Sequence, residues 1–365
     1  MKIAIPPSIT LIGKDAFKEC LYLDQVSIPC SVRSIGANSF KKCKALKQIS
    51  IPYSTTFIGK KAFSKCPNLK KVTTHFSVIP NKTNELNESN SSETSIENNA
   101  FCDCWSLTEI SIPFSITSIG NNAFYKCSSL KHISMPNSIV TVGKSSFREC
   151  NLLSQVNMSS ALTSINYDTF CDCKSLKKIT IPSSVRSIGE YAFYRCQNLT
   201  EISIPSSVTF IGPDSFGECT SLEQITIPSS VTEIGREAFK GCYSLKQVSL
   251  PSSLTSIEYD TFSECESLEE ITIPSSVTFI RDNSFCDCSS LVEISIPPSV
   301  VSIGRGAFQR CGSLKKVSIH SSEISIKQDV FVGCYSLKEI IIHSSIKLDD
   351  TGIGPKTKIY TFISK

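Results

Sequence analysis

Apolar residues recur along this chain at a fixed period. Fourteen phenylalanines mark the period, and each is followed three residues later by a cysteine and six residues later by a leucine. The sequence numbers of successive phenylalanines differ by 23, apart from one difference of 38. Such a regular pattern predicts a repeat array in which each unit covers the apolar side chains of its neighbours. The phenylalanines are Phe17, Phe40, Phe63, Phe101, Phe124, Phe147, Phe170, Phe193, Phe216, Phe239, Phe262, Phe285, Phe308 and Phe331.

The first half of a unit predicts a short strand that ends at a proline. Ile202 and Ile204 alternate with Glu201 and Ser203, as expected for a strand with one buried face. Pro205 follows, and eleven of the fifteen repeats have proline at this position. Because proline has no N–H group to donate, strand pairing is expected to end there.

The second half of a unit is expected to return through a corner and a helical turn. Val208 and Ile211 should point inward at the corner. A glycine follows Ile211, but five other repeats have Glu, Asn, Arg or Lys at that position, so a left-handed backbone is not required there. Residues 214–219 suit a single helical turn, which would place Phe216 and Cys219 on the same inward side.

A single unit cannot cover its own apolar side chains, so stability must come from stacking. Each phenylalanine or isoleucine buried between adjacent units contributes about 1.5–3 kcal/mol. The chain has 365 residues, of which 40% are hydrophobic and 19% are charged. This composition supports a large core and differs from that of disordered proteins. The sequence therefore predicts a repeat solenoid of about 14 repeats of 23 residues.

The repeat also resembles a known family. The pattern L-x-x-I-x-I-P-x-S-V-x-x-I-G-x-x-A-F-x-x-C is similar to the BspA-type, or Treponema-type, leucine-rich repeat, and the match covers almost all of residues 3–346. The near-uniform IPSSVT units resemble the large surface-antigen families of anaerobic parasitic protists. The resemblance implies an α/β solenoid that forms an arc, with a parallel sheet on its concave side and short helical turns opposite. It also implies roles in adhesion, host contact or protein binding.

Departures from the period predict how the chain is organised. Residues 1–350 are expected to form the solenoid, with a polar loop inserted at 80–94. Residues 351–365 lose the period and are expected to provide a closing strand and a tail. The amino-terminal edge has no comparable cap, so we expect either a trimmed chain or self-association through that edge.

Charge is unevenly distributed although the net charge is only +4. Residues 1–71 contain 13 Lys/Arg and 3 Asp/Glu, and stacking should bring many of these lysines together. Such a patch attracts polyanions, of which sulfated glycans, acidic lipids and nucleic acids are examples, or is simply a solvated surface. No motif predicts sequence-specific nucleic-acid binding. The lysines expected to bind are Lys42, Lys47, Lys65, Lys70 and Lys71.

The opposite charge dominates residues 201–293, which contain 15 Asp/Glu and 4 Lys/Arg. The strands there should present a row of large polar side chains beside a row of serine and threonine. A flat polar face of this kind suits a protein or glycan ligand, although β-propensity alone also favours Ser and Thr. The row consists of Gln224, Gln247, Glu270 and Glu293.

Other residue patterns give little support for chemistry. One cysteine per rung at an inward position predicts a small buried hydrophobe, although neighbouring rungs are within disulfide range. Cys-Asp-Cys pairs end at Cys104, Cys173 and Cys288, but they lack the spacing and histidine partners of common zinc sites. His320 and His343 occupy the proline position of consecutive rungs, where a metal or pH-sensitive site is an alternative to simple substitution.

No cofactor, metal or catalytic site is therefore expected. The chain has no run of about 18 apolar residues that would predict a transmembrane segment and no apolar leader at its start. Localisation stays open on these grounds. The sequence favours a non-enzymatic binding or adhesion scaffold, with an intracellular structural or protein-interaction solenoid as the alternative. Surface labelling of intact cells distinguishes these two hypotheses.

Overall fold

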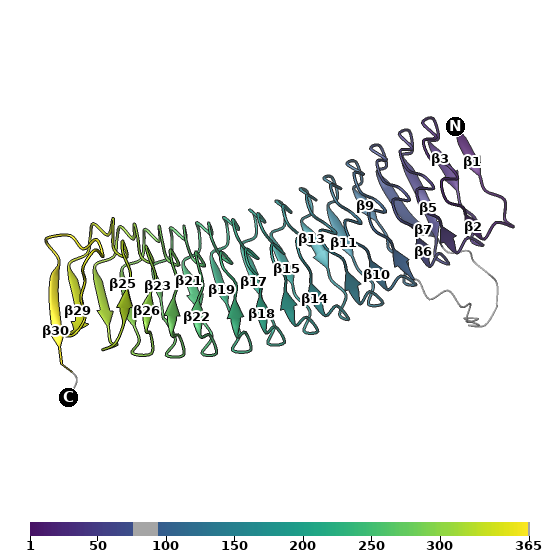
Figure 1. The fold of residues 1–365 in the computed structure, drawn as a ribbon. Coiled ribbons are helices and arrows are strands. Elements are labelled where there is room, and N and C mark those ends of the chain that lie inside the picture. Colours follow the sequence, from purple (N-terminus) through teal and green to yellow (C-terminus); the bar gives the residue numbers. More distant parts are fainter. Residues whose placement is uncertain (76–93, 364–365) are drawn as a thin grey trace. The chain divides into compact units, whose positions relative to one another are not determined.

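The computed structural model describes residues 1–75 and 94–363, and the chain divides into two compact units, 1–176 and 177–365. The predicted loop at 80–94 lies outside the described residues except for Thr94. In each unit the chain winds through successive rungs, and equivalent strands of successive rungs lie side by side in parallel (Figure 1). The described residues thus form β-solenoids in which each rung is one repeat of the sequence.

One strand of each rung lies on the side that the sequence predicts to be a sheet; we call this side the first sheet, and its strand pairing is interrupted once in each unit. In unit 1–176 these strands are β1 (Lys2–Ala4), β3 (Gln25–Ser27), β5 (Gln48–Pro52), β7 (Lys71–His75), β9 (Glu109–Ile110), β11 (His132–Ser134) and β13 (Gln155–Asn157). In unit 177–365 they are β15 (Lys178–Thr180), β17 (Glu201–Ser203), β19 (Gln224–Thr226), β21 (Gln247–Ser249), β23 (Glu270–Ile271), β25 (Glu293–Ile296), β27 (Lys316–Ile319), β29 (Glu339–His343) and β30 (Lys358–Phe362).

The predicted corner forms a second parallel sheet of two-residue strands. Val208 and Ile211 are buried there, as predicted, and Ile211 pairs in register with Ile234. In unit 1–176 these strands are β2 (Leu11–Ile12), β4 (Ser34–Ile35), β6 (Phe57–Ile58), β8 (Ser95–Ile96), β10 (Ser118–Ile119), β12 (Thr141–Val142) and β14 (Ser164–Ile165). In unit 177–365 they are β16 (Ser187–Ile188), β18 (Phe210–Ile211), β20 (Glu233–Ile234), β22 (Ser256–Ile257), β24 (Phe279–Ile280), β26 (Ser302–Ile303) and β28 (Ser325–Ile326).

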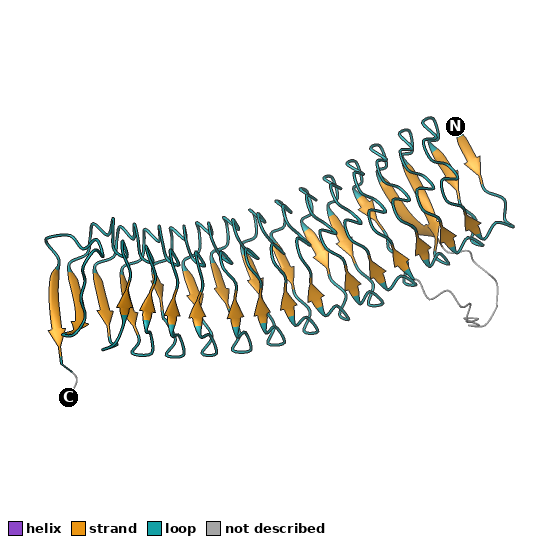
Figure 2. Cartoon of the chain, in the orientation of Figure 1, coloured by secondary structure: helices purple, strands orange, loops and turns teal. Residues whose placement is uncertain are grey.

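The helical turns predicted opposite the first sheet are wrong, and with them the α/β class. Over residues 1–75 and 94–363 the chain forms strands, turns and loops but no helix (Figure 2). In residues 214–219 the backbone N–H groups alternate between two kinds of acceptor. Gly217 and Cys219 donate to Asp214 and Phe216 within the turn, whereas Phe216 and Glu218 donate to carbonyls of the next rung. In a continued α-helix the N–H groups beyond the first turn would donate to carbonyls four residues earlier, so this side of the rung would lose its regular hydrogen bonds to the next rung.

This third side of each rung, which we call the turn ladder, depends on left-handed residues. Asp214 and Glu218 have φ of 50° and 55°, and equivalent residues in nearly every described rung also have positive φ. The left-handed turn after each hydrogen bond redirects the next N–H group toward the neighbouring rung. Left-handed backbone therefore occurs in the turn ladder and not at Gly212, which has no positive φ.

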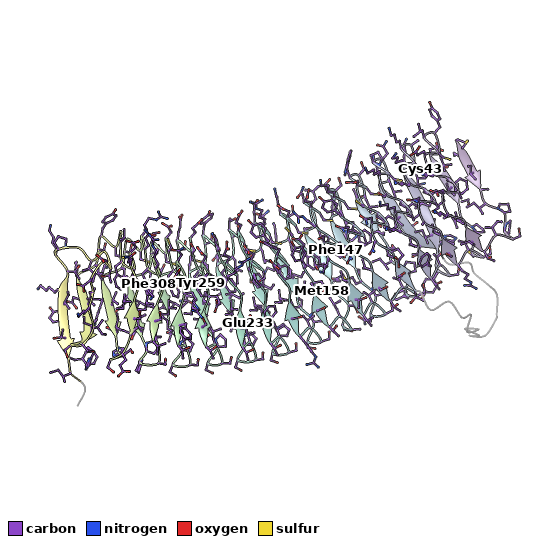
Figure 3. The ribbon with its side chains drawn as sticks, in the orientation of Figure 1. Cys43, Phe147, Met158, Glu233, Tyr259 and Phe308 are labelled. Atoms are coloured by element: carbon purple, nitrogen blue, oxygen red, sulfur yellow. The ribbon has the colours of Figure 1, made fainter. Side chains whose placement is uncertain are left out.

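The core of each unit lies between the two sheets and the turn ladder. Phe216 and Cys219 are fully buried, as the sequence predicts. Neighbouring phenylalanine rings stack nearly parallel, with centroids 5.4 Å apart for Phe216 and Phe239. Offset stacking at this distance adds about 0.5–1.5 kcal/mol per pair to the burial of the rings. Phe147 in unit 1–176 and Phe308 in unit 177–365, both labelled in Figure 3, stack on their neighbours in the same way.

Stacking continues across the one irregular gap in the sequence. Phe63 and Phe101, which lie on opposite sides of this gap, stack at 5.0 Å. The N–H of Lys65 donates to the carbonyl of Cys102, and β7 pairs with β9 through Lys71 and Glu109. Rungs that are separated in sequence are therefore direct neighbours in the unit.

The last rung of unit 177–365 is covered by β30, which pairs in parallel with β29 from Glu339↔Lys358 to His343↔Phe362. In unit 1–176, β1 pairs with β3 on one side. Self-association through the edge at β1 stays a prediction.

Candidate functional site

The first sheet of unit 177–365 aligns three of the four residues of the predicted polar row. Gln224, Gln247 and Glu270 are directly paired by the parallel register of β19, β21 and β23. All three are exposed, and the Nε2 of Gln247 donates to the Oε1 of Glu270 over 3.4 Å. A shallow groove of about 500 Å³ runs over Gln247 and Glu270 and reaches Pro274. The row therefore offers amide and carboxylate groups on a flat, polar surface.

Glu293, the fourth residue of this row, begins β25 and is also exposed. Its register partner in the next strand is Lys316, which is in turn paired with Glu339. The row of Gln224, Gln247 and Glu270 thus gives way to alternating charge from β25 onward. This alternation marks one end of the row.

The lysines of the first rungs gather on the turn ladder of unit 1–176. The pKa of Lys41 is lowered. Partial burial of its ammonium group is the largest cause, and repulsion from four lysines adds to it. The four are Lys61, Lys18, Lys42 and Lys65. A cluster of mutually repelling ammonium groups creates a positive potential that an anion would relieve.

Acidic neighbours offset only part of this charge. The Nζ of Lys42 lies 2.8 Å from Glu19, and that of Lys18 lies 3.5 Å from Asp15. Both lysine side chains are about 40% exposed, and such surface ion pairs contribute only about 0–1 kcal/mol. Lys42 and Lys18 can therefore exchange their acidic partners for a ligand anion at a small cost in free energy.

The five predicted lysines do not all belong to this cluster. Lys42 and Lys65 lie on the turn ladder. Lys47 and Lys70 are exposed on adjacent rungs just before β5 and β7, and the N–H of Lys70 donates to the carbonyl of Lys47 over 2.7 Å. Lys71 lies on the first sheet and pairs with Glu109 at 3.0 Å. The structure thus splits the predicted patch between two sides of the rung.

A groove of about 460 Å³ opens beside the turn-ladder cluster. It lies between the residues that precede and follow the repeat cysteine in three successive rungs. Its lining consists of Lys42, Lys44, Lys65, Pro67, Asp103 and Trp105. Trp105 is the only tryptophan of the chain, and 55% of it is exposed.

Trp105 and Asp103 were not predicted to belong to the basic patch. Both follow Lys65 in the chain only after the irregular gap, which separates the two rungs in sequence. Aligning the repeats on their cysteines would have provided the signal. Trp105 then falls in the same column as Lys44 and Pro67, directly after Cys104.

Comparison with known proteins agrees with this rung geometry. The family described as "BspA type Leucine rich repeat region" matches residues 1–88, 94–223 and 257–351, in six copies. The chain belongs to this family. No curated protein matches the chain.

Solved structures of similar proteins are also leucine-rich repeat solenoids. A leucine-rich repeat protein from Bacteroides ovatus is 26% identical, with a TM-score of 0.73, and 99% of this chain and 92% of that chain are covered. A leucine-rich repeat protein from Eubacterium ventriosum is 22% identical, with a TM-score of 0.55 and coverage of 96% and 92%. The pneumococcal vaccine antigen PcpA is 19% identical, with a TM-score of 0.53 and coverage of 99% and 83%. The last two likenesses show the fold alone.

The cysteines of this BspA-type repeat pack as apolar side chains. All eighteen are free in this structure, and most of them are buried. The Sγ of Cys219 donates to the carbonyl of Phe193 over 3.2 Å, and equivalent bonds recur from rung to rung. Burial raises the pKa of Cys43 and of Cys242 to about 12. Thiols held in the neutral form are poor nucleophiles and poor metal ligands.

The remaining polar clusters have local partners. His320 lies 3.2 Å from Ser295 and His343 lies 2.7 Å from Ser345, so each histidine contacts a serine hydroxyl. Among the described residues, no group of three or more His, Cys, Asp or Glu side chains could hold a metal ion. The same residues contain no helix with the length and apolar character needed to cross a bilayer.

Proposed function

We propose that this BspA-type solenoid is a non-enzymatic binding scaffold that binds a sulfated polyanion through the lysines of unit 1–176. The observation that supports the proposal most directly is the crowding around Lys41, whose pKa is lowered by burial and by its lysine neighbours. A polyanion that spans several rungs neutralises these ammonium groups together. These lysines are exposed or half-exposed, so a polyanion can reach them without a change of fold.

Heparin retention at low salt tests this proposal. Charge reversal at Lys42, Lys47, Lys65 and Lys70 is expected to abolish retention, because it replaces four positive charges on adjacent rungs by negative ones. The matched control reverses four exposed lysines of unit 177–365, namely Lys315, Lys338, Lys347 and Lys356. This control changes the net charge equally but should leave most of the retention in place. Equal loss in both variants, or no loss in the first, would contradict the proposal.

The exposed row of unit 177–365 supports a second binding surface. We propose that Gln224, Gln247 and Glu270 contact a protein or glycan ligand, with Glu293 at the end of the row. The support is their parallel register, which holds three polar side chains at one spacing of about 4.8 Å. Their outward direction and exposure make them available without any change of fold.

Affinity capture with the wild-type chain and with a Gln224→Ala, Gln247→Ala, Glu270→Ala variant tests this second surface. The variant is expected to lose a specific ligand while it keeps heparin retention, because the row lies outside the basic unit. An unchanged set of captured ligands would exclude the row as a binding surface. If the variant lost both its captured ligands and its retention on heparin, the substitutions would have disturbed the fold. The loss of ligands would then not reflect a local role of the row.

A further inference from the structure

The groove beside Trp105 combines charge and an aromatic face in one place. We propose that it is the primary subsite for a sulfated glycan, in which the indole stacks on a sugar ring while the lysines bind its sulfate groups. This inference rests on the proposed polyanion binding and specifies its ligand class and its centre. It concerns residues that both lie within unit 1–176 and line a single groove.

Rung stacking fixes the positions of the charged groups. Lys42, Lys65 and Asp103 each precede the repeat cysteine and have left-handed φ values of 62°, 60° and 61°. Their N–H groups donate to the next rung over 2.8–2.9 Å, so the backbone under all three is held by hydrogen bonds. Successive side chains are therefore about 4.8 Å apart at their base. A ligand meets a preformed row and does not have to order a loop.

The second wall of the groove comes from the residues that follow the cysteines. Lys44 and Pro67 lie beside Trp105 in this column. The carbonyl of Trp105 accepts hydrogen bonds from the N–H and the hydroxyl of the next rung, at Ser129 and Ser128. The indole is thus mounted on a fixed backbone but keeps more than half of its surface exposed.

An exposed indole between ammonium groups matches the chemistry of a sulfated sugar. One face of a pyranose ring consists of C–H groups, which pack against the electron-rich face of an indole. Sulfate groups on the same ring or its neighbours reach the ammonium groups of Lys44 and Lys65. Among the described residues, neither of these lysines has an ion pair within 4 Å, so both are available.

Asp103 favours a glycan over a nucleic acid. Its carboxylate lines the groove in the same row as Lys42 and Lys65 and can accept hydrogen bonds from sugar hydroxyls. The same carboxylate repels the evenly spaced phosphates of a single strand. Proteins that bind single strands without sequence preference also stack successive bases on successive aromatic side chains, whereas this groove contains one aromatic residue.

Because Trp105 is the only tryptophan, its fluorescence reports the groove directly. Titration with a heparin hexasaccharide is expected to quench or blue-shift the emission until the site is saturated, since stacking removes water from the indole. Desulfated hexasaccharide and an oligothymidylate of equal charge are the comparison probes. Saturable change with the sulfated sugar alone supports the proposal. A larger response to the oligothymidylate would overturn it in favour of a nucleic acid.

Substitutions separate the groove from the wider patch. Trp105→Ala and Lys44→Gln are each expected to weaken hexasaccharide binding at least about threefold, because each removes one exposed contact. Tyr243→Ala is the matched control, since Tyr243 occupies the same position of the repeat but lies beside Glu264. It should bind as the wild type does.

The two proposals can fail separately. In one outcome, charge reversal of the lysines abolishes heparin retention, the hexasaccharide leaves the Trp105 emission unchanged, and Trp105→Ala binds it as tightly as the wild type. The groove is then not the subsite, and the polyanion function stands. If the wild-type chain is not retained on heparin, the polyanion function fails. A response of Trp105 to free hexasaccharide without retention would contradict the idea that the groove and the lysine cluster act together.

Discussion

Asp214 is a buried carboxylate whose neighbours determine its proton affinity. Burial raises its pKa to about 6, and repulsion from Glu237 on the next rung adds to the effect. Arg236, Lys240 and a hydrogen bond from Tyr191 act in the opposite direction but do not cancel it. The residue keeps a left-handed φ of 50°, which Asn also adopts easily. Its ionised form therefore destabilises the rung at neutral pH.

The sign of the pH dependence follows from this raised pKa. The folded chain binds a proton at Asp214 near pH 6, whereas the unfolded chain binds it near pH 4. Between these values the folded state holds more protons, so its stability rises as pH falls. Asp214→Asn is expected to raise the free energy of unfolding by about 1 kcal/mol at pH 7, with a gain that disappears toward pH 4.

Thermal unfolding at several pH values measures this effect. Glu233→Gln is the control, because Glu233 is exposed on the second sheet (Figure 3) and loses a hydrated charge only. If Asp214→Asn raised the free energy of unfolding equally at pH 4 and pH 7, the ionised carboxylate of Asp214 would not be what destabilises the rung.

Individual buried residues were predictable, whereas the lining of the groove was not. The inward positions of Phe216 and Cys219 follow from their period, because only one side of a rung can meet the core. Asp103 and Trp105 depend on which rungs are neighbours in space. The irregular gap between Phe63 and Phe101 hides that relation unless the rungs are aligned across it.

At the scale of elements, the first sheet was predictable from alternation and from the terminal proline. The turn ladder was not, because a phenylalanine and a cysteine three residues apart suit a helical turn equally well. What decides between them is the source of hydrogen-bond partners for the backbone. The neighbouring rung provides a carbonyl acceptor for every second N–H group of the turn. The sequence of one repeat does not reveal these acceptors.

The second sheet also depends on neighbours. Its strands have only two residues, such as Phe210–Ile211, which is too short for alternation to be recognised in a sequence. Each pairs with strands of adjacent rungs, so the sheet exists only in the stack. Left-handed residues cost about 1–2 kcal/mol each when they are not glycine. The hydrogen bonds between rungs offset this cost at positions such as Glu218.

At the scale of the whole molecule, stability depends on the equivalence of the rungs. Backbone hydrogen bonds join neighbouring rungs on all three sides, and the phenylalanine column adds a stacked core. Each rung is therefore stabilised by its two neighbours and not by contacts far along the chain. A rung should be removable if equivalent positions are rejoined.

Deletion of residues 217–239 tests this claim most directly, because it removes one complete repeat and joins Phe216 to Lys240 as Phe239 is joined now. Circular dichroism and thermal unfolding are expected to show a folded β-protein with a melting temperature close to that of the parent chain. Deletion of residues 217–228 is the control, since it leaves a rung of about half length that cannot pair on all three sides. The half-repeat deletion is expected to be far more destabilising than the full-repeat deletion. Equally complete unfolding of both variants would contradict stabilisation of each rung by its two neighbours.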